Sequence, residues 1–339
     1  MCAIEGETNP IGSISVIIPA LNEARRLPEL LAALAAQTYP PAEVIVVDGG
    51  STDGTPEVVR NWAAAHPQLP VCLLPNPQRH IPHALNIGIA VARGEVIVRL
   101  DGHARPATDY LEQCLRVLRE TGAEIVGGAW TIRPGASSLV AEAIARAVSS
   151  PLGAGDALYR LPGARAQVVD TVPFGCFRRE LWRRMGGYNQ ALLTNEDYEF
   201  ATRVRQGGGR VWFDPRLRCE YFARPTFAEL VRQYWRYGWW KAQMLRRYPR
   251  SLRWRQAVPI LWSALGPLLW LTSLWLPTLW LAIGLWAGYG TVLAISALQQ
   301  TGFRRLRLSL LIAFAYLLIH FAWGWGVWVG WFSLRRTGE

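Results

Sequence analysis

The chain has 339 residues, a formal net charge of +11 and five cysteines without CxxC pairs or zinc-ligand spacing. Neither a disulfide framework nor a structural zinc site is therefore expected. No Asp, Glu, Lys or Arg occurs between Ala257 and Phe303, and His320 is the one ionisable side chain other than tyrosine between Leu308 and Leu334. Because about 20 apolar residues suffice to cross a bilayer, the composition excludes a wholly soluble protein and predicts a soluble domain followed by a membrane domain.

The positive charge is concentrated just before the apolar region. Nine Arg or Lys residues and one acid, Glu229, lie from Arg224 to Arg255. Such a belt attracts anionic headgroups, and the positive-inside rule assigns it to the cytoplasm. We therefore expect the membrane as a partner and no nucleic acid. Residues 1–12 contain acids and no apolar core of signal-peptide length, so the soluble domain is expected to stay in the cytoplasm.

Strands and helices alternate along the first hundred residues. Two β-branched runs, 13–19 and 43–48, flank a helical stretch over 27–37. A helix over 55–65, a strand over 71–74, a helix over 82–92 and a strand over 95–100 continue the pattern. This alternation predicts a Rossmann-like, mostly parallel α/β sheet with helices on its faces. Ligands in such sheets bind outside the carboxyl ends of the strands.

Polar residues follow the first two predicted strands. Pro19 ends the first, and Asn22 and Glu23 follow it. Asp48 ends the second, and Asp53 belongs to the GGSTDGT segment that comes directly after Asp48. A carboxylate at a strand end can accept hydrogen bonds from a base or ribose, and glycines let the backbone approach a ligand. The alternative is an ordinary turn followed by a helix cap.

Two further motifs carry ionisable groups. Asp101 and His103 lie two residues apart after the predicted strand 95–100, so their side chains project to the same side and could share one divalent cation. Such a cation would neutralise a departing diphosphate. Glu196 and Asp197 stand at the start of a helical stretch, where they either favour the helix dipole or, in the case of Asp197, act as a general base.

The remainder is predicted to be helical and membrane-associated. Residues 226–248 form an amphipathic basic pattern that suits either the membrane interface or the surface of the soluble domain. The predicted division is an N-terminal extension over 1–12, an α/β domain over 13–225, an interfacial segment over 226–255 and about three membrane spans over 256–334. With three crossings Arg335 and Arg336 would lie outside, unless the last segment is re-entrant.

Taken together and in this order, the motifs resemble those of the family 2 glycosyltransferases. The matching landmarks are Pro19, Asn22 and Glu23, Asp48 with GGSTDGT, RHIPHALNIG from Arg79 to Gly88, Asp101-Gly102-His103, Gly186-Gly187-Tyr188 and Glu196-Asp197. Gln233 to Tyr237 (QYWRY) is similar to the family's QxxRW motif. The resemblance implies a GT-A fold, a nucleoside-diphosphate sugar donor, a Mg or Mn ion and inversion at the anomeric carbon.

The resemblance also implies roles for single residues. The nucleotide sugar would contact a set made of Pro19, Asn22, Glu23, Asp48, Asp53, Arg79 and Asp101, with Asp48 on the base. Asp101 and His103 would hold the metal, although His103 stands where the family has a second carboxylate. Asp197, beside Glu196, would be the catalytic base. Gln233, Arg236 and Tyr237 would lie on the acceptor and diphosphate side, with Tyr237 in place of the family's tryptophan.

We expect a multi-pass enzyme of the inner (cytoplasmic) membrane. Its acceptor would be a polyprenyl-diphosphate-linked saccharide used for exopolysaccharide or cell-envelope glycan. The alternatives are a polyprenyl-phosphate sugar synthase and a processive polysaccharide synthase. A protein of a different class, a non-catalytic membrane protein that binds nucleotide sugars, would not need Asp101, His103 and Asp197 together.

Overall fold

The computed structural model describes residues 12–275 and 277–333. Its contacts divide the chain into two compact units. The first comprises the chain up to Thr131 together with Gly163–Tyr221, and the second comprises Ile132–Pro162 together with the chain from Phe222 onwards. The second unit therefore includes residues 132–162, which the sequence interpretation placed in the domain over 13–225.

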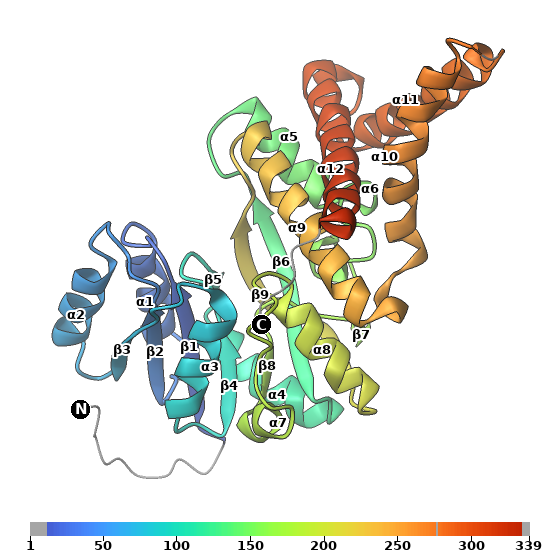
Figure 1. The fold of residues 1–339 in the computed structure, drawn as a ribbon. Helices are drawn as coiled ribbons and strands as arrows, with labels where there is room; N and C mark the ends of the chain where they lie inside the picture. Colours follow the sequence, from blue (N-terminus) through green and yellow to red (C-terminus); the bar gives the residue numbers. More distant parts are fainter. Residues whose placement is uncertain (1–11, 276, 334–339) are drawn as a thin grey trace. The chain divides into compact units, whose positions relative to one another are not determined.

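The central sheet is mixed, with strand order β3-β2-β1-β4-β8-β6-β9-β5 and β7 paired to β9 (Figure 1). The parallel part consists of β1 (Ile14–Ala20), β2 (Glu43–Asp48), β3 (Val71–Pro75) and β4 (Val96–Arg99). The antiparallel part consists of β5 (Arg105–Pro106), β6 (Ile125–Arg133), β7 (Gln167–Val168), β8 (Cys176–Arg178) and β9 (Val211–Phe222). The predicted α/β class is thus confirmed, and the four parallel strands are the four predicted from the sequence.

Six helices of the first unit accompany this sheet. They are α1 (Leu27–Ala35), α2 (Thr55–Ala65), α3 (Ile81–Val91), α4 (Tyr110–Thr121), α7 (Arg179–Arg184) and α8 (Glu196–Gln206). In α1 the buried residues Leu27, Leu30, Leu31 and Leu34 recur at the spacing of one helix face. They join the β-branched side chains of β1 and β2 in the main core. This packing fixes the strand ends from which the polar loops emerge.

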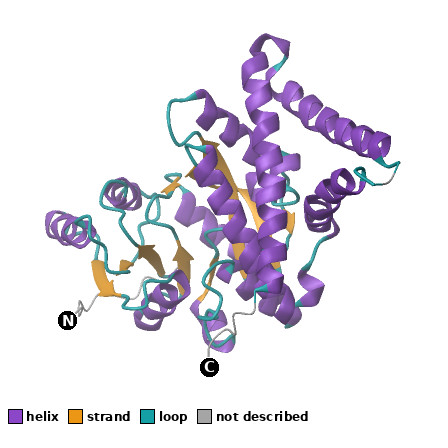
Figure 2. Cartoon of the chain, turned by 45° about the horizontal axis from the view of Figure 1, so that its top comes forward, coloured by secondary structure: helices purple, strands orange, loops and turns teal. Residues whose placement is uncertain are grey.

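The second unit is helical apart from the ends of β6 and β9 (Figure 2). It contains α5 (Leu139–Val148), α6 (Pro151–Ala154), α9 (Phe227–Arg247), α10 (Trp254–Thr272), α11 (Leu279–Thr301) and α12 (Leu306–Phe332), with short 3-10 turns at Leu158–Arg160, Pro249–Ser251 and Phe303–Arg305. The Thr226 side chain caps α9 by accepting a hydrogen bond from the Glu229 N–H. The predicted helix over 226–248 is therefore confirmed.

Two segments in the described part of the chain are long and apolar enough to cross a membrane, Leu279–Thr301 and Phe303–Phe332. They differ in how far they are covered by protein. In its most apolar stretch the first is 17% buried and the second 44% buried. Two spans are fewer than the roughly three expected from the sequence, because α10 does not meet the same criterion.

Candidate active site

The loops that follow β1, β2 and β4 meet at one edge of the sheet. Ala20 at the end of β1 pairs with Asp48 at the end of β2, and Ile17 of β1 pairs with Arg99 at the end of β4. Parallel strands present their carboxyl ends at the same edge. The first three sequence motifs are therefore brought together by strand register.

The loops after β1 and β2 are joined by hydrogen bonds. Asn22, in a left-handed conformation with φ 58°, donates its N–H to Ser51 Oγ at 2.8 Å and accepts the Thr52 N–H at Oδ1 at 2.9 Å. The Glu23 N–H donates to Thr55 Oγ1 at 2.9 Å. These bonds make one rigid platform at the sheet edge, so the predicted proximity of Asn22 and Glu23 to the GGSTDGT segment is present in the structure.

Asp48 and Asp53 shape this platform. Asp48 is buried, and its carboxylate accepts the N–H groups of Gly50 and Ser51 and the Ser51 hydroxyl. Asp53 accepts the Thr55 hydroxyl at 2.6 Å and the Ala24 N–H at 3.0 Å. The hydrogen bond from Thr55 lowers the pKa of Asp53, which stays ionised. Both carboxylates thus make the contacts of an ordinary turn and helix cap. Any contact of Asp48 with a nucleotide base would be additional.

Arg79 lies on the loop between β3 and α3. Its side chain is exposed and its φ is 63°. Its backbone passes close to the second loop, since a Cβ added to Gly49 would lie 3.4 Å from Arg79 Cα. The guanidinium is therefore available to an anion held above the platform.

Asp101 and His103 stand beside Glu23. His103 Nδ1 lies 2.8 Å from Glu23 Oε1, and the Glu23 side chain passes over Gly102, where an added Cβ would come within 2.8 Å of Glu23 Cγ. Burial opposes protonation of His103, but the hydrogen bond with Glu23 and the charge of Asp101 outweigh it, so the pKa of His103 is raised. The pairing with Glu23 was not predicted from the sequence.

These residues fit a divalent cation that takes part of its coordination from a substrate. Asp101 Oδ2 and His103 Nε2 make no hydrogen bond within residues 12–275 and 277–333. Over the same ranges the structure has no cluster of three or more His, Cys, Asp or Glu side chains that could hold a metal. Mg²⁺ is usually bound by one or two carboxylates together with substrate phosphates, and Asp101 supplies one such carboxylate. A carboxylate on the second imidazole nitrogen is the usual support of a histidine ligand.

Arg99 connects Asp101 to Glu196, the neighbour of the predicted base. It is buried, and its Nη2 donates to Asp101 Oδ1 at 3.1 Å while its Nη1 donates to Glu196 Oε1 at 2.7 Å. Burial opposes its charge, but the neighbouring carboxylates keep the pKa of Arg99 well above its ordinary value. The sequence could have indicated this residue by its position. Arg99 ends a β-branched strand two positions before Asp101, so both side chains point to one side.

The two carboxylates at the start of α8 have different surroundings. Glu196 is 4% exposed, and burial raises its pKa to about 7 despite Arg99. Asp197 is half-buried, and its Oδ1 accepts the Tyr198 N–H at 2.7 Å. Burial also raises the pKa of Asp197, with Arg99 opposing the change. Asp197 is thus the less buried of the two carboxylates, whereas Glu196 is paired with Arg99.

Asn86 fixes the loop that precedes α8. This side chain of α3 accepts the Tyr188 N–H at 2.8 Å and donates to the Tyr188 carbonyl at 2.8 Å. The loop turns at Gly186 and Gly187, whose φ values of 70° and 80° favour glycine. The RHIPHALNIG and Gly-Gly-Tyr segments thus contact each other, which the sequence alone did not indicate.

Gln233, Arg236 and Tyr237 belong to α9 in the second unit. Gln233 is buried and donates from Nε2 to Tyr237 Oη at 3.0 Å, while Arg236 is exposed. Their spacing of four residues puts Gln233 and Tyr237 on one helix face. Their role toward an acceptor stays a prediction.

Comparisons with known proteins identify the family of the chain. The chain matches the model of glycosyl transferase family 2 over residues 15–176 and that of glycosyl transferase family group 2 over residues 96–333. It is 31% identical over 330 residues to the succinoglycan biosynthesis protein ExoA of Rhizobium meliloti, covering 95% of this chain and 96% of that protein.

Two other relatives bear on fold and substrate. One relative, from Methanococcus voltae, is 24% identical, covering 71% of this chain and 76% of that protein. It is named dolichyl N-acetyl-alpha-D-glucosaminyl phosphate 3-beta-D-2,3-diacetamido-2,3-dideoxy-beta-D-glucuronosyltransferase. The structure of the mannosyltransferase PcManGT from Pyrobaculum calidifontis with GDP-Man and Mn²⁺ is 25% identical, with a TM-score of 0.63, covering 90% of this chain and 87% of that one. The expected GT-A architecture is therefore confirmed.

Proposed function

Since the chain belongs to glycosyltransferase family 2 and is a glycosyltransferase, we propose that it transfers a sugar from a nucleoside-diphosphate sugar to a lipid-linked acceptor with inversion at the anomeric carbon. The observation that carries this proposal is the chain of contacts Asp101–Arg99–Glu196, with Asp197 next to Glu196. One buried arginine thereby joins the groups suited to a diphosphate to the groups suited to a proton.

The residues divide into a donor side and an acceptor side. The nucleotide lies on the platform formed by Asn22, Glu23, Asp48 and Asp53, with Arg79 toward its phosphates. Asp101 and His103 would hold a divalent cation, Mg²⁺ or Mn²⁺, and such an ion would supply positive charge to a leaving diphosphate. Mn²⁺ in the Pyrobaculum mannosyltransferase supports dependence on a divalent ion in general.

Asp197 performs the proton transfer. As the acceptor hydroxyl oxygen bonds to the anomeric carbon, its proton passes to the Asp197 carboxylate and the bond from the anomeric carbon to the diphosphate oxygen breaks. Glu196 stays paired with Arg99, which holds the start of α8 beside Asp101. A single displacement of this kind inverts the anomeric configuration.

The acceptor proposed is a polyprenyl-diphosphate-linked saccharide at the cytoplasmic face of the inner membrane. The apolar helices of the second unit support membrane association, and the Methanococcus relative acts on a dolichyl-linked sugar, as its name states. A polyprenyl-phosphate sugar synthase is the second candidate, since curated relatives named undecaprenyl-phosphate 4-deoxy-4-formamido-L-arabinose transferases match about a third of the chain.

Incorporation of label into lipid tests the proposal. Membranes containing the protein are incubated with a panel of radiolabelled nucleotide sugars, and the organic extract is counted beside extracts from Asp197→Asn and Asp101→Asn membranes. One sugar should label the extract in a metal-dependent way for the unaltered protein alone. If no sugar labels it above the variants, the lipid-linked acceptor is wrong. Anion-exchange chromatography of the labelled lipid then separates a diphosphate-linked saccharide from a monophosphate-linked sugar, because the diphosphate carries more negative charge.

A further inference from the structure

Helix α12 is the central helix of the second unit. Although its composition is that of a membrane span, residues along its whole length are buried against α5, α9, α10 and α11. The buried positions are Leu308, Ser309, Ile312, Ala315, Tyr316, Ile319, Ala322, Gly324, Gly326, Val327 and Gly330. A helix covered in this way is not a span surrounded by lipid.

Helix α9 runs beside α12 in the same direction. The Phe227 and Phe314 rings contact each other with centroids 5.1 Å apart near the start of α9. Near its end Gln243 Nε2 donates to the Gly330 carbonyl at 2.8 Å. Arg246, which lies nineteen residues after Phe227 in α9, donates to the carbonyl of Trp331. The two helices therefore stay in contact over about 17 residues of α12.

Glycines permit this close contact. A Cβ added to Gly326 would lie 2.4 Å from the Trp235 carbonyl oxygen, and one added to Gly330 would lie 2.6 Å from that of Trp239. A Cβ added to Gly238 of α9 would lie 2.1 Å from the Trp323 carbonyl oxygen. The small-residue spacing of Gly326 and Gly330 thus serves contact with α9, whereas Gly284 and Gly288 of α11 meet no described atom within 4 Å.

Helix α9 is too charged to lie in hydrocarbon. It carries Glu229, Arg232, Arg236, Lys241, Arg246 and Arg247 within 21 residues. Each such charge costs about 2.5–3.5 kcal/mol at the bilayer centre even on the lowest scale. Since α9 must lie at or outside the interface, α12 from Phe314 to Trp331 lies there with it.

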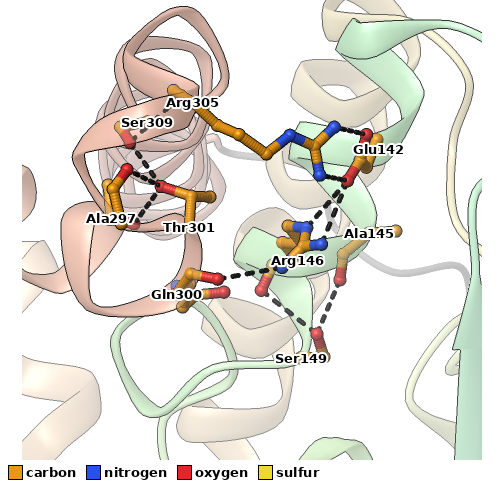
Figure 3. Close-up of polar contacts among 10 residues, drawn as sticks. Glu142, Ala145, Arg146, Ser149, Ala297, Gln300, Thr301, Arg305 and Ser309 are labelled. Atoms are coloured by element: carbon orange, nitrogen blue, oxygen red, sulfur yellow. Dashed lines mark hydrogen bonds and ion pairs between the residues drawn. The ribbon is translucent and has the colours of Figure 1, made fainter.

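The start of α12 is tied to another charged helix. Arg305 donates through Nη1 and Nη2 to Glu142 of α5 at 2.8 and 2.7 Å, and Glu142 also accepts from Arg146 (Figure 3). Arg146 Nη1 reaches the Gln300 carbonyl at the end of α11 at 3.0 Å. One ionised carboxylate paired with two arginines is expected outside the hydrocarbon. Both ends of α12 are therefore bonded to polar segments.

The hairpin formed by α10 and α11 has the opposite character. Between Gln256 and Phe303 it carries no Asp, Glu, Lys or Arg, while Arg253 and Arg255 precede it and Arg304 and Arg305 follow it. Its exposed side chains near the turn are large and apolar, including Leu274, Trp275 and Trp280 at 70–80% exposure. Figure 1 shows this turn projecting away from α12. Arginines at both ends and tryptophans at the turn match a hairpin inserted from an anionic surface.

We propose that the α10–α11 hairpin alone enters the hydrocarbon of the bilayer, and that α12 does not cross it, so both ends of α12 lie on the side of the catalytic unit. The four residues between Phe222, at the end of β9, and Phe227, at the start of α9, reach about 14 Å at most. Because this is too little to cross the ~30 Å hydrocarbon core of the bilayer, α9 begins on the same side of the membrane as the catalytic unit. The inference rests on the proposed membrane location.

Thiol labelling of single-cysteine variants tests this arrangement. Cys2 and Cys72 are changed to serine in the full-length chain, whereas Cys114, Cys176 and Cys219 are kept because they are buried. A single cysteine is then introduced at Phe303, Phe332 or Trp275. Glu57→Cys on exposed α2 marks the catalytic side. A membrane-impermeant maleimide is applied to right-side-out and to inside-out vesicles, and sugar transfer by each variant verifies folding.

Phe303→Cys and Phe332→Cys should react in the same vesicles as Glu57→Cys, and Trp275→Cys should not react in those vesicles. Reaction of Phe332→Cys in the opposite vesicles would overturn the proposal, because α12 would then cross. Rapid reaction of Trp275→Cys on the catalytic side would overturn the insertion of the hairpin. A protein absent from the membrane fraction altogether would instead refute the proposed membrane location.

Discussion

Asp197→Asn separates proton transfer from structural support at the start of α8. Asparagine keeps the size of the side chain, and its Oδ1 can still accept the Tyr198 N–H that Asp197 accepts at 2.7 Å. The free energy of unfolding should therefore change by less than the roughly 0.5–1.5 kcal/mol that a hydrogen bond contributes, because this bond is kept. Loss of a general base lowers the rate about 10²–10⁴-fold, which corresponds to about 2.7–5.4 kcal/mol of barrier.

Glu196→Gln is the matched control, because its structural cost should be larger. Glu196 is buried and accepts Arg99 Nη1 at 2.7 Å. Hydrogen bonds to charged groups contribute about 1.5–3 kcal/mol, so this variant should unfold at lower denaturant concentration while Asp197→Asn does not. The assay combines turnover, nucleotide-sugar affinity and denaturant unfolding. A near-normal rate for Asp197→Asn, with unchanged donor affinity, would refute its role as the base.

Three further predictions concern the same site. Arg99→Lys should lower kcat with little change in donor KM, because one ammonium cannot replace a guanidinium that bridges Asp101 and Glu196. Steady-state kinetics measure both constants, and a fall in donor affinity alone would contradict this prediction. Glu23→Gln should raise the divalent-ion concentration needed for half-maximal rate about 10–100-fold, since Glu23 orients His103, and an unchanged metal titration would contradict it. The pKa of Glu196, about 7 against an ordinary 4.5, means that the folded state holds this proton more tightly than the unfolded state. Glu196 should then lower the free energy of unfolding as pH rises from 4.5 to 7, and Glu196→Gln should reduce that slope in urea unfolding measured across this range.

Much of the sheet edge could be predicted because local patterns determine it. Runs such as EVIVVD predict buried strands, and polar residues directly after parallel strands meet at one edge whatever the details of packing. The proximity of Asn22, Glu23 and the GGSTDGT segment followed from that rule alone. The position of α9 followed from its 3.6-residue periodicity.

The contacts between distant segments could not be predicted in the same way. The pairs His103–Glu23, Arg99–Glu196 and Asn86–Tyr188 join residues 80 to 102 positions apart, and no periodicity connects them. The environment of α12 was missed for a related reason. Hydropathy measures only how apolar a segment is, and Leu, Ile and Trp side chains bury equally well against lipid or against α9.

The stereochemistry of transfer tests the central claim most directly. With the nucleotide sugar that labels the lipid extract, the anomeric configuration of the new linkage can be assigned by NMR and compared with that of the donor. The account predicts inversion, because Asp197 accepts a proton in one displacement and forms no bond to the sugar. A product that keeps the configuration of the donor would contradict this assignment of the site.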